Sequence, residues 1–112
     1  MAVPYRWEGL ATMINAKPIQ IGDRTVMGIT VELPKTTLVI VTTDKGYIMC
    51  GALDVALLNE RLRARNIIAG RATGVRTLED LLEAPLESVT HTAEELGIVP
   101  GMKGRDAILK ML

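Results

Sequence analysis

The sequence predicts an α/β domain of the α+β type, built on one mixed β-sheet. The first half is a series of β-branched, apolar runs separated by short turn sequences, which indicates an antiparallel meander. A helical pattern then lies between two short apolar runs, as in a crossover between parallel strands. The second half contains short segments with helix-capping residues. We therefore expect a meander, one right-handed β-α-β crossover and short helices mainly on one face.

At 112 residues the chain has the length of one small domain. The first twelve residues, MAVPYRWEGLAT, show no periodicity, and patterned sequence begins at Met13. We expect residues 1–12 to be a loosely ordered N-terminal extension and residues 13–112 to be a single domain.

The meander begins with two predicted strands, Lys17–Ile21 and Thr25–Leu33, around a Gly22-Asp23 turn. The second strand alternates polar residues with apolar ones, so that one face should be core and the other wetter. The apolar positions are Met27, Ile29, Val31 and Leu33.

A second pair of strands should follow the turn at Pro34-Lys35. Thr37–Thr42 is almost continuously apolar, which is typical of a central strand buried on both faces. Gly46 can take the positive φ of a tight hairpin, so Tyr47–Cys50 should pair antiparallel with the central strand.

The crossover helix should start after Asp54, whose carboxylate can accept bonds from the first free N–H groups, and run to about Arg65. Asn66–Gly70 is then expected to form a strand parallel to Tyr47–Cys50.

The rest of the chain predicts three short helices and one strand. Thr77 should cap a helix that Pro85 ends, and Leu86–Thr90 should form a short edge strand. Thr92 starts a capping-box sequence, and Arg105–Leu112 has the apolar spacing of a final helix.

The composition narrows the classes of function. Thirteen basic and thirteen acidic residues cancel, which gives no charge footprint for nucleic acid or an acidic membrane. A single cysteine and no apolar run near the length of a membrane span favour the cytoplasm. A hydrophobic share of 48% in a chain this short favours a homo-oligomer.

Several motifs together resemble one known family. They are LPKT at 33–36, KGYIMCG at 45–51, GVRTLEDLL at 74–82, and AEELGI with a following GM at 93–102. The chain from about Met13 onward is similar to the YunC-like family, a domain of unknown function found in bacteria and archaea. The resemblance implies a small cytoplasmic α/β protein and assigns no activity or cofactor.

Cys50 is the first candidate for chemistry, because it stands where a strand gives way to a helix. A thiol facing the helix N-terminus would favour the nucleophilic thiolate, and Gly51 would let a ligand approach. The nearby carboxylate of Asp54 opposes this effect. Free cysteine is also often a small apolar residue of the core, so both roles stay open.

His91 is the only histidine, and any Cys-His catalytic pair must use it. Nothing in the sequence brings the two residues together. One cysteine and one histidine cannot complete a four-ligand zinc site without suitably spaced carboxylates, so we expect no metal, and no motif calls for a cofactor.

Arg71 and Arg76 are candidates for binding a small anionic ligand, because they flank a loop between a strand and a helix. Lys35 would join them if its turn lies at the same end of the sheet. The loop lacks the glycine patterns of nucleotide sites, and solvated or carboxylate-paired arginines are the commoner outcome.

We therefore favour a non-enzymatic protein that self-associates or binds a small ligand. The alternative is a cysteine-dependent enzyme with Cys50 as nucleophile and Arg71 or Arg76 binding an anionic substrate. A third hypothesis is an interaction module that docks a partner along an exposed strand edge.

Overall fold

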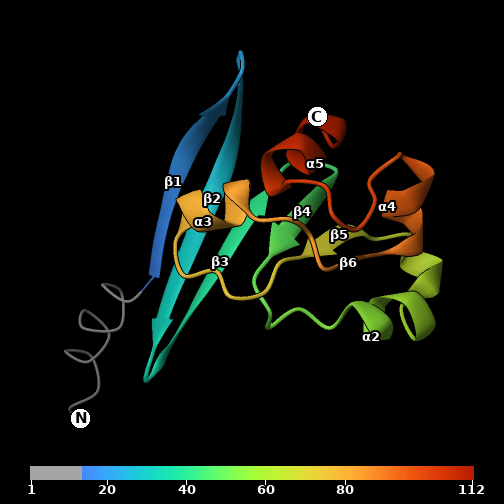
Figure 1. Ribbon diagram of the computed structural model, residues 1–112, viewed down its shortest axis with the longest axis horizontal. Coiled ribbons are helices and arrows are strands. Elements are labelled where there is room, and N and C mark those ends of the chain that lie inside the picture. Colours follow the sequence, from blue (N-terminus) through green and yellow to red (C-terminus); the bar gives the residue numbers. More distant parts are fainter. Residues whose placement is uncertain (1–13) are drawn as a thin grey trace, which may run out of the picture.

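The computed structural model describes residues 14–112, so the predicted extension at residues 1–12 lies outside the described part. The predicted fold class is confirmed: one six-stranded mixed sheet carries short helices (Figure 1), and the strands follow one another in chain order across it. The elements are β1 (Ile14–Ile21), β2 (Arg24–Leu33), β3 (Thr36–Thr42), β4 (Gly46–Met49), α2 (Val55–Glu60), η1 (Arg63–Arg65), β5 (Ile68–Arg71), α3 (Leu78–Glu83), β6 (Ser88–Val89), α4 (His91–Glu95) and α5 (Gly104–Lys110).

Strands β1 to β4 form the predicted antiparallel meander. β1 begins at Ile14, three residues before the predicted start, because Ile14 pairs with Val31 and the ladder uses nearly the whole length of β2. The β2–β3 turn places Lys35 at a φ of 66°, a left-handed conformation that few non-glycine residues adopt. This turn fixes Lys35 at the tip of a long hairpin.

The crossover is also present, since β4 and β5 are parallel and α2 connects them. Asp54 caps α2 as predicted, with its Oδ1 accepting a hydrogen bond of 3.0 Å from the Leu57 amide. The helix ends at Glu60 rather than near Arg65. The Arg61 and Leu62 amides both bond to the Leu57 carbonyl, which breaks the regular ladder, and a 3₁₀ turn follows.

The C-terminal half contains the three predicted helices, with one correction. Thr77 caps α3 as expected, but α4 is capped by Thr90 and not by Thr92. Thr90 Oγ1 also accepts a bond from the Ala69 amide and donates to the Ile67 carbonyl, so this buried hydroxyl ties α4 to β5. Within residues 14–112, no helix is long and apolar enough to cross a membrane.

One face of the sheet is covered by α3 and α5. A Cβ added to Gly28 would meet Leu78 of α3, and one added to Gly104 of α5 would meet Ile48 of β4. The inward-facing Val39, Val41 and Ile48 are all 0% exposed. The main core therefore lies between the sheet and these two helices.

Residues 14–112 leave the opposite face of β1 to β4 largely uncovered, and we call it the open face. α2 lies on this side of the sheet (Figure 1), and its buried Val55 and Leu58 belong outside the main core cluster. The alternating apolar residues of β2 point to the open face, where Met27 is 40% and Leu33 is 44% exposed. The expectation that this apolar set forms the core is thus wrong: Gly28, on the other face, leaves the room in which α3 packs.

Candidate functional site

Cys50 follows β4 directly and is buried, with 6% of its surface exposed. Its amide donates to the Val39 carbonyl at 3.1 Å, which continues the strand pairing by one residue. Cys50 belongs to the main core cluster together with residues of α3 and α5. This placement favours an apolar packing role for the thiol.

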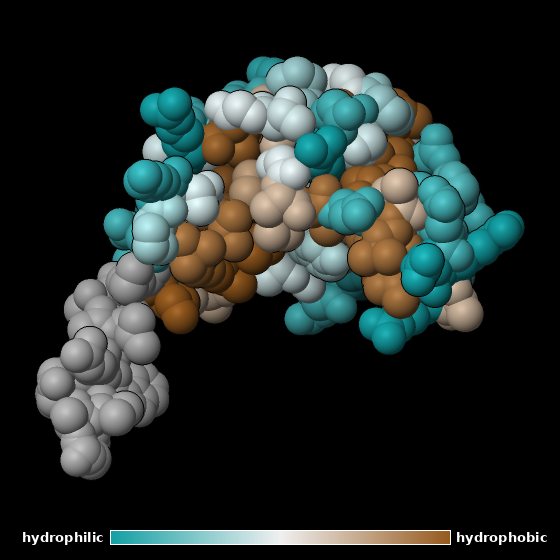
Figure 2. Space-filling view, turned by 90° about the horizontal axis from the view of Figure 1, so that it is seen from below, coloured by the Kyte–Doolittle hydropathy of each residue, from teal (hydrophilic) through white to brown (hydrophobic). Residues whose placement is uncertain are grey.

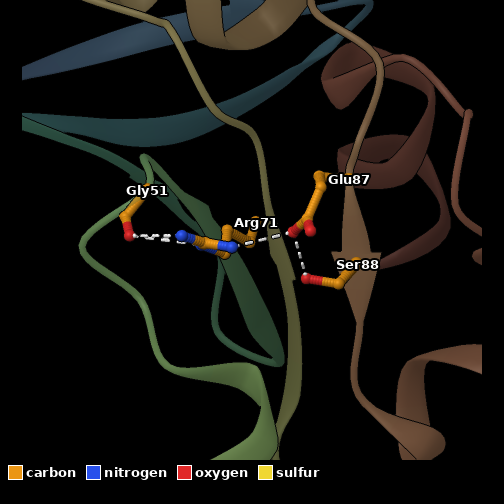
Figure 3. Close-up of polar contacts among 4 residues, drawn as sticks. All are labelled: Gly51, Arg71, Glu87 and Ser88. Carbon is orange, nitrogen blue, oxygen red and sulfur yellow. Dashed lines mark hydrogen bonds and ion pairs between the residues drawn. The ribbon is translucent and has the colours of Figure 1, made fainter.

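Arg71, at the end of β5, ties together the corner that follows Cys50 (Figure 3). Its Nε and Nη2 donate to the Gly51 carbonyl at 3.1 and 3.0 Å, and its Nη1 donates to Glu87 Oε1 at 3.0 Å. Ser88 Oγ donates to the same carboxylate oxygen at 2.7 Å. One planar guanidinium therefore fixes the loop after β4 to the strand pair β5–β6.

The charges at this corner are paired. The Ser88 hydroxyl, and then the Arg71 guanidinium, hold the pKa of the Glu87 carboxyl below its ordinary value. Three N–H groups of Arg71 thus donate hydrogen bonds to protein oxygens, which leaves fewer donors for binding an anion. Sequence reasoning named Arg71 and Gly51 but missed Glu87 and Ser88, because the pairing of Ser88 opposite Arg71 depends on the β5–β6 register.

A hollow of about 620 Å³ lies beside this corner, between the start of α2 and strands β5 and β6. Gly51, Arg71 and Glu87 line it, whereas Cys50 and His91 do not. The His91 amide donates to Asn59 Oδ1 at 2.9 Å, but within residues 14–112 no hydrogen bond joins His91 to Cys50. A Cys-His pair stays a prediction without support from this geometry.

A second hollow, of about 720 Å³, contains the other two predicted ligand residues, Lys35 and Arg76. We call it the Lys35–Arg76 hollow. Its walls are the tip of the β2–β3 hairpin and the loop before α3, where Gly74 has a φ of 75°. The predicted anion site is therefore divided: Lys35 and Arg76 share one hollow, and Arg71 lines another. The residues that line the Lys35–Arg76 hollow are Glu32, Leu33, Lys35, Thr36, Thr37, Gly74, Val75 and Arg76.

Metal-ligating side chains do not gather in the described part of the chain. Among residues 14–112, no three His, Cys, Asp or Glu residues are grouped so that they could hold a metal ion.

Comparison with known proteins gives a consistent assignment. The family model of a domain of unknown function, DUF1805, matches residues 49–111. The uncharacterized protein YunC of Bacillus subtilis (strain 168) is 61% identical over 100 residues, which cover 89% of this chain and 99% of that protein. A protein of unknown function from Thermoplasma acidophilum, TA1206, has a similar crystal structure, with a TM-score of 0.80 and 32% identity. That match covers 89% of this chain and 94% of TA1206.

Proposed function

The chain belongs to the DUF1805 family of YunC-like proteins, and from this premise we propose that it acts as a self-associating domain whose copies meet through the open face. The observation that carries the proposal is a broad apolar surface on the uncovered side of the sheet, visible in Figure 2. Ile14 is 60% exposed there, and Met27 and Leu33 are exposed on the same face of the neighbouring strand β2. Monomeric proteins rarely expose a continuous apolar patch of more than a few hundred Å².

The open face carries no charge along β1 to β4. The strand registers place every charged residue of β1 and β2 on the opposite face: Lys17, Arg24 and Glu32. The open-face positions of these strands are Ile14, Ala16, Pro18, Gln20, Thr25, Met27, Ile29, Val31, Leu33, Thr36, Leu38, Ile40, Thr42, Tyr47 and Met49. A face without charges needs no complementary charge on its partner, so it can pack against a copy of itself.

The size of the open face also fits a second copy. Strands β1 to β3 present a surface of roughly 400 Å², if a strand rises about 3.3 Å per residue and neighbours lie about 4.8 Å apart. This flat estimate is already about half of the roughly 800 Å² per partner in a standard interface, before side-chain relief and β4 are added. Pairing along the outer edge of β1 is less favourable, because Pro18 has no N–H to donate.

The test is the mass of the full chain in solution, measured by light scattering on a size-exclusion column over a range of concentrations. We expect a multiple of 12.2 kDa for the wild type. Ile29→Glu should give 12.2 kDa with an unchanged circular dichroism spectrum, because a charge would have to be buried at the centre of the face. If that variant does not fold, Met27→Glu at the more exposed neighbouring position serves the same purpose.

Leu109→Glu is the matched control, since Leu109 is 48% exposed on α5 and lies away from the open face. This variant should keep the wild-type mass. A wild-type chain that stays at 12.2 kDa throughout would contradict the proposal.

A further inference from the structure

The Lys35–Arg76 hollow is lined by two cationic residues from separate elements. Lys35 stands at the tip of the β2–β3 hairpin, and Arg76 lies about forty positions later, directly before the cap of α3. Within residues 14–112, neither side chain forms an ion pair, whereas Arg71, Lys103 and Arg105 all do. The described lining of the hollow therefore carries two positive side chains and the single carboxylate of Glu32, with no ion pair between them.

The hollow also has the size and the neutral groups of a ligand site. Its volume of about 720 Å³ lies within the roughly 300–1,000 Å³ of typical small-molecule pockets. Thr36 and Thr37 add hydroxyl groups on the hairpin wall, and Gly74 keeps the opposite wall free of a side chain. The β2–β3 turn holds Lys35 in a left-handed backbone conformation, which places the residue at the tip of the hairpin.

We propose that this hollow binds a small organic anion, whose phosphate or carboxylate group lies between Lys35 and Arg76. The planar guanidinium of Arg76 suits two oxygens of such a group, and the Lys35 ammonium supplies a point charge from the other wall. Glu32 lines the same hollow and repels a bare anion, so the preferred ligand carries a hydroxyl or ammonium donor beside its anionic group. This site belongs to a single chain and goes beyond self-association.

The experiment is a titration of the full-length, ¹⁵N-labelled chain followed by NMR, at constant ionic strength set with chloride. Inorganic phosphate and malate are the two probes, because each carries an O–H donor beside its anionic group, and together they separate phosphate from carboxylate recognition. We expect saturable shifts at the amides of 35–37 and 74–76 with at least one probe. If neither probe gives such shifts, the proposal is overturned.

Three substitutions sharpen the test. Lys35→Gly keeps the backbone conformation of the turn, and Arg76 is exposed, so that Arg76→Gln removes its charge without disturbing the core; both variants should therefore fold. Each should weaken binding about tenfold, because it removes one positive charge from the site. Glu32→Gln should instead strengthen the binding of inorganic phosphate, because it removes a repulsion. A weaker affinity in Glu32→Gln would contradict the placement of the anion.

Arg63→Gln and Lys110→Gln are the controls, because each removes one exposed charge from outside the hollow. They should leave the affinity within about twofold, since exposed charges beyond a Debye length are screened. An equal loss in these controls would show a diffuse charge effect and would overturn the site.

Discussion

Both faces of the sheet carry apolar side chains, but helices α3 and α5 cover only one of these faces. On the covered face, Val41 and Ile48 are packed under α3 and α5 and are fully buried. On the open face, the neighbouring Ile40 and Met49 are also apolar, but they remain partly exposed. Alternating apolar residues along a strand therefore identify an apolar face of the sheet. They do not predict whether helices of the same chain or another molecule bury that face.

Matched truncations on adjacent residues of β4 should show the largest effect. Ile48→Ala should lower the free energy of unfolding by about 2–5 kcal/mol, because it leaves a cavity between the sheet and α5. Met49→Ala should cost clearly less in the isolated chain, since its side chain is already partly in water. Urea unfolding at low protein concentration measures both values.

Measuring both variants over a range of protein concentrations makes the comparison of the two faces more specific. The cost of Met49→Ala should grow with protein concentration if copies cover the open face, because association stabilises only the folded state. The cost of Ile48→Ala should stay constant. Equal costs for the two variants at every concentration would mean that the two faces do not differ.

The Cys50 side chain is buried in the core of the covered face, so Cys50→Ser should have an intermediate effect on the free energy of unfolding. We expect a loss of about 1–3 kcal/mol, because a hydroxyl would be buried in an apolar cluster. Alkylation of the native thiol should be slow and should become fast only in denaturant. Rapid labelling of the folded protein, with Cys50→Ser leaving stability unchanged, would instead favour the nucleophile hypothesis.

The smallest effect is expected from Glu83, which links the two helices over the covered face. Its carboxylate accepts a bond from Arg105 Nε at 3.1 Å and lies 3.5 Å from Lys103 Nζ. The hydrogen bond from Arg105, with the nearby charges, lowers the pKa of Glu83 below its ordinary value of 4.5.

The sign of the pH effect follows from that lowered pKa. The stabilisation is present above the ordinary value and is lost as the pH falls through the lower, folded-state value. Glu83→Gln should therefore flatten the acidic side of the stability curve slightly, as measured by urea unfolding at several pH values. Glu95→Gln, which removes a carboxylate without an ion pair in residues 14–112, should leave the curve unchanged.

The sequence predicted elements well where the deciding groups are local. Asp54 and Thr77 were identified as helix caps, and both accept the expected amide bonds. The errors fall where distant groups compete. Thr90 replaces Thr92 as a cap because its hydroxyl also bonds to Ile67 and Ala69, at the start of β5, and no local pattern reports that contact.

The candidate site was predicted in part. Lys35 and Arg76 were selected for their charge and their position in loops, and the structure brings them into one hollow. Arg71 was selected for the same reasons, but its guanidinium is occupied by Gly51 and Glu87. The difference depends on which strand pairs with β5, and that is a property of the sheet and not of the loop sequence.

The sequence by itself determined the strands, the crossover and the caps at Asp54 and Thr77, because these depend on turn residues, side-chain periodicity and bonds within a few residues. Only the tertiary structure decided which side of the sheet is the core. A strand with period-two alternation offers two faces, and the choice between them was made by helices far along the chain, where Gly28 leaves room for Leu78.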